Sequence, residues 1–229
     1  MIFEEIAMET NEKELKEKYF LEAAETFAKE KSEYSIWKSG ESYRELHDLF
    51  IKHNREKSTE YQLLGIEQLK RIGKNNIIGQ RYMSLGELFE IDNQEKALIF
   101  FEGAAAAFSK VKNYKANLKA AKLKILICLI CMKDTHKLIL FLETNKLLIP
   151  HQKFCLALLY ALEGQNDQLM DVDLTNKEEK ELIDKVCNGG REEALEYIEK
   201  FKEDVHLSTH ASLIFDYFEE VYGLEAEMC

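Results

Sequence analysis

Apolar residues recur every three or four positions along most of the chain, with charged and polar residues between them. This spacing is typical of amphipathic helices, which bury one face and expose the other. The recurring positions are Tyr19, Ala23, Ala24 and Phe27, then Trp37, Tyr43, Leu46 and Phe50, then Leu63, Ile66, Leu69 and Ile72, then Ile78, Tyr82, Leu85 and Phe89, then Leu98, Phe101, Ala105 and Phe108. We expect a separate helix for each set, and Asn93 is expected to cap the last of them.

The predicted helices follow one another at a nearly constant interval. A helix recurs about every 18 to 20 residues and a pair about every 35 to 40, the period of tetratricopeptide-like hairpins. Gly65, Gly86 and Gly103 stand where neighbouring helices would approach closely. The pattern therefore predicts an all-α fold, a tetratricopeptide-like helical-hairpin solenoid in which antiparallel helices form a twisted sheet.

The pattern changes after about residue 144. Pro150 opens a predicted helix near its first position, where the missing N–H costs little. The polar stretch 165–175 is predicted to be a connection, and three helices are predicted over 178–187, 191–202 and 209–222. We expect a solenoid over residues 1–165 and a C-terminal helical bundle over 166–229, packed together as one continuous unit.

Composition supports the helical prediction and argues against a nucleic-acid-binding protein. The 229 residues include one Pro and 10 Gly, and 46% are hydrophobic. So few helix breakers favour an almost wholly helical chain. The formal net charge of −11 argues against nonspecific nucleic-acid binding, because Lys and Arg drive binding to phosphate.

The sequence predicts no targeting or membrane-spanning segment. Glu4 and Glu5 stand where a secretory signal would be positive. The most apolar run, 125–132, is far shorter than the roughly 20 residues of a membrane span. Five Cys without framework spacing are typical of reduced thiols. We expect a soluble, cytoplasmic protein.

No familiar pattern of catalytic or metal-binding residues is convincing. Cys128 and Cys131 form a C-x-x-C pair inside an apolar run without a second pair, so buried structural thiols are favoured. His206 and His210 could share a helix face, but surface or capping roles are favoured. No glycine-rich phosphate-binding sequence occurs. The prediction is a protein that is not an enzyme and uses no metal or other cofactor.

A stripe of Lys stands out in this acidic chain. Lys112, Lys115, Lys119 and Lys122 are spaced 3, 4 and 3 apart, which places them on one face of a helix expected to begin near Lys112. Between 110 and 124 there are six Lys and no Asp or Glu. A solvated helix face is the ordinary explanation, and an acidic partner is the alternative. The adjoining apolar face is expected to hold Ala116, Ala120, Leu123 and Ile127.

Three stretches carry a resemblance to a known family. The first is Gly73-Lys-Asn-Asn-Ile-Ile-Gly-Gln-Arg-Tyr-Met-Ser-Leu-Gly-Glu-Leu-Phe-Glu90 followed by Gln94-Glu-Lys-Ala-Leu-Ile-Phe-Phe-Glu-Gly-Ala-Ala-Ala-Ala-Phe108. The others are Glu17-Lys-Tyr-Phe-Leu-Glu-Ala-Ala-Glu-Thr-Phe27 and 177–204. In this order they resemble the soluble NSF attachment protein family, of the alpha-SNAP type. The resemblance is distant, spans residues 14–229 with a weaker stretch at about 137–175, and its individual motifs are weak.

The resemblance implies an adaptor that lies along a SNARE four-helix bundle and recruits the hexameric ATPase NSF, which takes the bundle apart. The family's SNARE-contacting lysines fall on Lys119 and on Leu123, which Lys122 and Lys124 flank. Its other basic positions fall on Gln80, next to Arg81, and on Lys74. The predicted SNARE-binding set is Lys74, Arg81, Lys112, Lys115, Lys119 and Lys122.

The resemblance also assigns roles to the two ends of the chain. Residues 205–229 contain five acids and no Lys or Arg, and Met228 stands where the family has a penultimate Leu. The predicted NSF-binding residues are Glu192, Glu193, Leu224, Glu225, Glu227 and Met228. The family has a loop at its N-terminus that touches the membrane. Ile2 and Phe3 are therefore expected either to keep this peripheral membrane contact or to belong to an end that packs on the first hairpin.

One alternative from a different class stays open. A tetratricopeptide scaffold that binds peptide segments or chaperone tails would share the helical period. Such a scaffold needs a groove with Asn and Lys placed to hold a carboxylate, whereas the adaptor needs a broad basic face.

Overall fold

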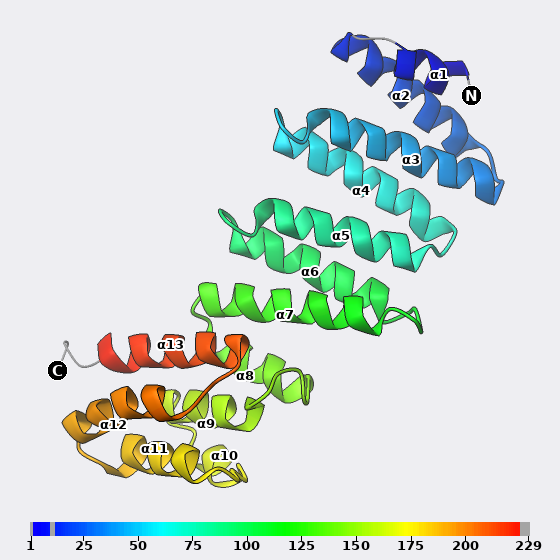
Figure 1. Cartoon of the computed structure of the whole chain (residues 1–229). Coiled ribbons are helices and arrows are strands. Elements are labelled where there is room, and N and C mark those ends of the chain that lie inside the picture. Colours follow the sequence, from blue (N-terminus) through cyan, green and yellow to red (C-terminus); the bar gives the residue numbers. More distant parts are fainter. Residues whose placement is uncertain (1, 10–11, 225–229) are drawn as a thin grey trace. The chain divides into compact units, whose positions relative to one another are not determined.

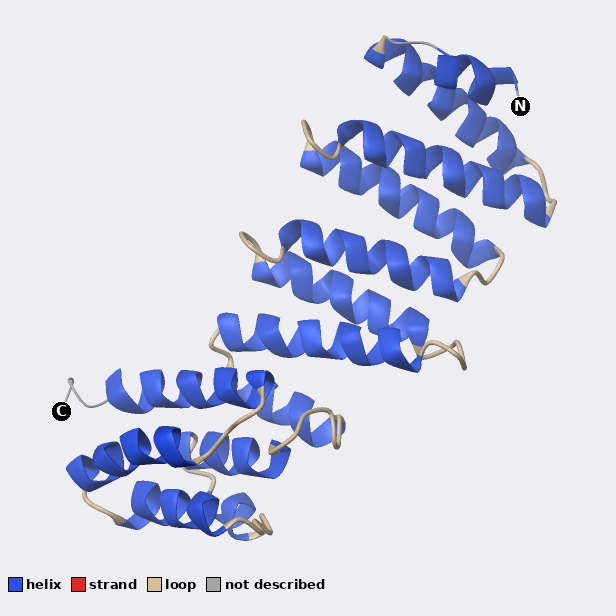
Figure 2. Cartoon of the chain, viewed as in Figure 1, coloured by secondary structure: helices blue, strands red, loops and turns tan. Residues whose placement is uncertain are grey.

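The computed structural model describes residues 2–9 and 12–224, and helices occupy most of them (Figures 1 and 2). No strand occurs among these residues, which confirms the all-α prediction. The helices are α1 (Ile2–Glu9), α2 (Lys13–Lys29), α3 (Glu33–Phe50), α4 (Arg55–Arg71), α5 (Asn75–Phe89), α6 (Gln94–Phe108), α7 (Lys115–Cys131), α8 (Thr135–Thr144), α9 (Gln152–Leu162), α10 (Asn166–Met170), α11 (Lys177–Asn188), α12 (Arg191–Asp204) and α13 (Thr209–Leu224).

The chain forms two compact units. The first contains residues 1–91 and 99–121, and the second contains 92–98 and 122–229. This division differs from the predicted boundary between residues 165 and 166. The reason is that Phe154 and Leu158 of α9 belong to one hydrophobic cluster with Phe201 and Phe215 of the C-terminal helices.

In the first unit, successive helices pack against each other from α1 to α5. Phe20, Ala24, Leu46 and Tyr61 from α2, α3 and α4 share one buried cluster. The hydroxyl of Ser39 donates to the carbonyl of Ala24 at 2.8 Å, which ties α3 to α2 in the interior. These elements form helical hairpins (Figure 1).

The predicted close approach at Gly65 is confirmed. A Cβ built on Gly65 would lie 2.5 Å from Arg81 Nη1 and 3.1 Å from the Gly40 carbonyl oxygen. Both distances are below ordinary van der Waals separation, so glycine is the residue that lets α3, α4 and α5 meet here.

Helices α5, α6 and α7 are held together by small and aromatic side chains. Ala104, Phe108 and Ala121 form the buried centre, with Tyr82 and Leu118 packed against it. At the start of α6 the Asn93 side chain accepts from the Lys96 N–H at 3.0 Å, which confirms the predicted cap.

Two details of the predicted Lys helix are wrong. Helix α7 begins at Lys115, so Lys112 lies in the turn before it. The packed face is formed by Ala121, Ile125, Leu126, Cys128 and Leu129, whereas Ala116 and Ala120 are exposed. Alanine costs little on either face, and the end of α7 (125–131) is apolar on every side. The spacing of apolar residues alone therefore could not identify the buried face.

The second unit is built around aromatic side chains. Phe154, Phe201 and Phe215 meet with ring centroids 5.2 to 6.2 Å apart, and Leu158 and Leu182 complete the buried surface. The three predicted C-terminal helices are confirmed as α11, α12 and α13. The predicted connection at 165–175 contains the short helix α10, whose five residues are too few to show a helical period.

The entry to α9 differs from the prediction. The helix begins at Gln152, two residues after Pro150, and His151 adopts a left-handed conformation with φ of 57°. The buried Gln152 side chain accepts from the Leu148 N–H at 2.7 Å and donates to the Leu142 carbonyl at 2.6 Å. These bonds fix the turn between α8 and α9, and they set the start of the helix.

Candidate functional site

The basic face of α7 is the strongest candidate interaction surface. Lys115 and Lys119 are exposed and Lys122 is half-buried, and their spacing places all three on one face of the helix. Lys112 is exposed in the preceding turn. Among the described residues none of these four Lys makes an ion pair. Their charges are therefore not neutralised by ion pairs within the described part of the chain.

The turn that carries Lys112 is fixed to α5 and α6. The Tyr114 ring stacks on Phe108, with centroids 5.7 Å apart and planes at 12°. The Asn76 side-chain amide donates to the Tyr114 hydroxyl at 3.4 Å. These contacts hold the start of α7 beside the start of α5, as Figure 1 also shows.

A hollow of about 630 Å³ lies where α3 and α5 begin, and sequence reasoning missed it. We call it the α3–α5 hollow, and it is lined by Glu33, Tyr34, Trp37, Lys74, Asn76 and Ile77. Lys74 Nζ lies 2.7 Å from Glu33 Oε1, so the predicted partner-binding Lys74 already has a carboxylate at its side. The hollow joins residues about 40 positions apart in the sequence, which no local pattern reveals.

Arg81 is not part of any surface. The residue is only 4% exposed, and it donates to the Gly40 carbonyl at 2.9 Å and to Glu41 Oε1 at 2.7 Å. Burial lowers the pKa of the Arg81 guanidinium, and the neighbouring Glu41 carboxylate opposes that shift. The prediction of Arg81 as a binding residue is therefore wrong. Its position next to Gln80 gave no sign that α3 closes over it.

The residues predicted to bind NSF belong to the second unit, and the structure describes the side chains of two of them, Glu192 and Glu193. Glu192 and Glu193 are exposed in the first turn of α12, and Glu193 pairs with Lys185 of α11. Leu224 ends α13, and its side chain is outside the described part of the chain. Glu225, Glu227 and Met228 also lie outside the described residues.

The N-terminal residues form helix α1, which packs on α2. Ile2 is 71% exposed, whereas Phe3 is 37% exposed and stacks on Tyr19 with centroids 6.4 Å apart. Glu4 pairs with Lys38 of α3 at 3.3 Å. The segment thus packs on the first hairpin and still presents Ile2 to solvent.

Among the residues that the structure describes, the Cys and His side chains form no cluster that could hold a metal ion. The two thiols of the C-x-x-C pair lie in different environments, because Cys128 is buried and Cys131 is exposed. Within residues 2–9 and 12–224, no three His, Cys, Asp or Glu side chains come together in a way that could hold a metal ion. None of the helices described there is both long and apolar enough to cross a bilayer.

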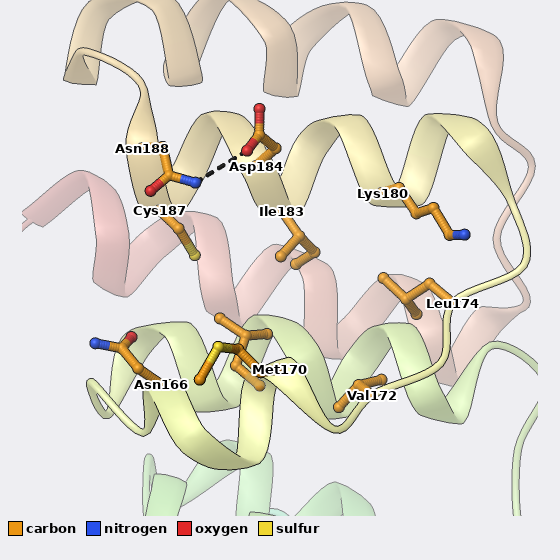
Figure 3. A pocket seen from close by; sticks show the side chains of 10 residues that line it. Asn166, Met170, Val172, Leu174, Lys180, Ile183, Asp184, Cys187 and Asn188 are labelled. Carbon is orange, nitrogen blue, oxygen red and sulfur yellow. Dashed lines mark hydrogen bonds between the residues drawn. The ribbon is translucent and has the colours of Figure 1, made fainter.

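A second hollow of about 460 Å³ lies between α10 and α11 (Figure 3). Ile183 and Cys187 of α11 point toward Met170 of α10, and the Asn188 amide donates to Asp184 at 2.9 Å on the rim. Partial burial, together with the nearby Asp184 carboxylate, raises the pKa of the Cys187 thiol, which keeps it protonated near neutral pH. This hollow offers apolar surface and no reactive group.

No protein-family model, curated protein or solved structure matches the chain. The surfaces that could carry a function are the basic face of α7, the α3–α5 hollow beside its start, and the acidic residues of α12.

Proposed function

We propose that this protein is an adaptor that binds SNARE four-helix bundles and recruits an NSF-type ATPase to disassemble them in vesicle trafficking and membrane fusion. The observation that carries the proposal is a set of Lys on α7 and just before it that make no ion pair with any described residue, in a chain of net charge −11. The resemblance to the soluble NSF attachment proteins supplies the identity of the partners.

Electrostatics explains why such a face would bind an acidic coiled coil. Complementary fields raise the rate of encounter and fix the register of the two partners. Each exposed charge pair contributes only about 0 to 1 kcal/mol, so several Lys must act together. Lys112, Lys115, Lys119 and Lys122 form the proposed SNARE-binding face, with Lys74 at its edge, while Arg81 has a structural role.

The proposed ATPase contact lies on acidic residues of the C-terminal part of the chain. Glu192 and Glu193 are exposed on α12, and Glu225, Glu227 and Met228 follow α13. Acidic side chains would steer toward a basic ATPase surface, and an apolar residue would add a desolvated anchor. In this proposal the protein is not an enzyme itself, and it reaches membranes through SNARE complexes.

A two-step reconstitution tests the proposal. The full chain is mixed with a pre-formed SNARE bundle at low salt, and then NSF and ATP are added. We expect capture of the bundle, weaker capture as salt is raised, and ATP-dependent disassembly that requires this chain. Isolated SNARE helices are the control for the bundle, and failure to capture any bundle at low salt would refute the proposal.

A peptide-binding scaffold is the second candidate, and one observation favours it. Lys74 and Asn76 line the same hollow, and these are the residue types that hold a terminal carboxylate. Glu33 lies beside Lys74 and opposes a second carboxylate there. Comparing peptides with a C-terminal carboxylate and a C-terminal amide distinguishes this function, because only a carboxylate clamp separates the two.

A further inference from the structure

We propose that the α3–α5 hollow receives an apolar side chain of the same acidic helical partner, and that Glu33 competes with a partner carboxylate for Lys74. This inference rests on the proposed function and adds a specificity pocket to the basic face. The partner is an acidic coiled coil that carries an exposed apolar residue beside an acidic one.

The wall of the hollow is suited to an apolar side chain. Tyr34 is 60% exposed, and its ring lies 6.3 Å from that of Trp37 at a tilt of 39°. Ile77 of α5 completes the apolar lining. Exposed aromatic residues that line a concavity are the side chains that most often anchor a protein interface.

The ion pair at the edge of the hollow is suited to exchange. The side chain of Lys74 is 39% exposed and that of Glu33 is 65% exposed, so water screens their attraction. A carboxylate from a partner can replace Glu33 at the ammonium group with little net change in energy. Glu33 is the one acidic residue among the described residues that line the hollow, and it repels the acidic partner until that exchange occurs.

The hollow continues the basic face of α7. Asn76 lines the hollow and also binds Tyr114, the residue that precedes Lys115. From Lys115 to Lys119 the helix rises by about 6 Å. An extended helical partner can contact the Lys face and the hollow together, whereas a short peptide end would need the hollow alone. This continuity, with the charge of the Lys, is why the occupant is an acidic coiled coil.

The single tryptophan makes the inference directly measurable. Trp37 is the only Trp in the chain, so its emission reports on the hollow when the SNARE bundle has its own Trp residues replaced by Phe. We expect binding of that bundle to shift Trp37 emission to shorter wavelength and to protect it from acrylamide. Tyr34→Ala should weaken bundle binding about tenfold. Leu147→Ala, at a residue that is 91% exposed in the second unit, is the control and should have no effect.

Glu33→Gln supplies the sharper variant because it should strengthen binding. Removing the competing carboxylate frees Lys74, and we expect about threefold tighter binding of the bundle. Glu67→Gln is the matched control, since Glu67 is also an exposed acid paired with a Lys, here Lys70. It makes the same change in net charge, so a gain shared by both variants would reflect overall charge alone and would overturn the inference.

The outcomes separate this inference from the proposed function. Bundle capture without any change in Trp37 emission overturns the inference and leaves the adaptor function standing. Absence of bundle capture overturns both. A Trp37 response to a carboxylate-ended peptide but not to the bundle assigns the hollow to peptide binding, which also overturns the helical occupant.

Discussion

Arg81 on α5 donates to the carboxylate of Glu41 on α3 at 2.7 Å, and this pair is buried on the Arg81 side. The same guanidinium donates to the Gly40 carbonyl. The Arg81 side chain therefore connects α5 to α3, between residues about 40 positions apart in the sequence. It also lies against Gly65 of α4, where a Cβ would leave it no room. A basic residue that sequence patterns assign to a surface acts as an internal support.

Arg81→Leu should lower the free energy of unfolding by about 1 to 3 kcal/mol, because the Gly40 carbonyl and the Glu41 carboxylate lose their donor. Urea unfolding followed by circular dichroism measures the change. Lys70→Ala is the matched control, since it removes the exposed Lys70–Glu67 pair and should cost less than about 1 kcal/mol. Equal losses in the two variants would contradict the structural role of Arg81.

Stability should fall as the pH drops below about 6.5, in part because of His47. Burial lowers the pKa of this imidazole below its ordinary value of 6.5, and its Nδ1 lies 2.7 Å from Ser58 Oγ in the interior. The unfolded chain then binds more protons than the folded chain, so the contribution is complete above pH 6.5 and declines below it. Urea unfolding at several pH values gives this slope.

The control for His47 is a variant that cannot titrate. His47→Gln should flatten the decline below pH 6.5 while lowering stability at neutral pH, since the amide fits the hydrogen bonds of the site less well. If the variant keeps the full wild-type slope, another group is responsible for the pH dependence.

Reversing the charge of the α7 face should weaken binding to SNARE bundles. The triple change Lys115→Glu, Lys119→Glu and Lys122→Glu replaces attraction by repulsion, and we expect at least about a tenfold loss and a smaller salt dependence. The residues are outside the packed face, so circular dichroism should stay unchanged. Affinity is measured by fluorescence anisotropy of a labelled bundle.

A matched variant separates position from net charge. Lys52→Glu, Lys146→Glu and Lys177→Glu change the same number of charges at exposed residues elsewhere. This variant should bind nearly as the wild type does at moderate salt, where the range of electrostatic forces is about 8 to 10 Å. Equal losses in both triple variants would remove the α7 face from the proposed interface.

Replacing Ile2 and Phe3 by Ser should reduce recovery of SNARE-bound protein with liposomes. The two residues differ in role: Ile2 is largely exposed, while Phe3 stacks on Tyr19. Inserting exposed apolar surface into the interface contributes at most about 2 to 3 kcal/mol per side chain. We therefore expect Ile2→Ser to affect flotation and Phe3→Ser to affect stability as well.

Ile91→Ser is the control for flotation, because Ile91 is 92% exposed at a position with no predicted membrane role. Its recovery should equal that of the wild type. If Ile2→Ser also floats like the wild type, α1 serves only to pack on the first hairpin.

Deleting residues 225–229 should leave bundle capture intact and lower stimulation of the ATPase. The deletion removes Glu225, Glu227 and Met228, the acidic and apolar groups of the predicted contact. ATP hydrolysis and bundle disassembly are measured with a saturating amount of the chain. Met228→Ala tests the apolar anchor alone, and unchanged stimulation in both variants would move the contact to Glu192 and Glu193.

The sequence by itself determined the position of most helices, although it predicted neither α1 nor α8. Apolar residues at helical spacing predict which face of a helix is buried. In α5 these residues include Ile78, Leu85 and Phe89, and all three are buried. Asn93 marks the start of α6 because its side chain can bond the helix end locally. The helix α10 also escaped prediction, because its five residues show no period.

Only the tertiary structure decided which of the polar and small residues are exposed. Ala116 and Ala120 fit a buried stripe as well as an exposed one, and the neighbours of α7 selected Ala121 and Ile125 instead. Arg81 became internal because Gly40 and Gly65 let three backbones approach. The α3–α5 hollow joins Trp37 to Ile77, which are brought together by packing. Local periodicity encodes which residues share a helix face, whereas burial depends on contacts between distant parts of the chain.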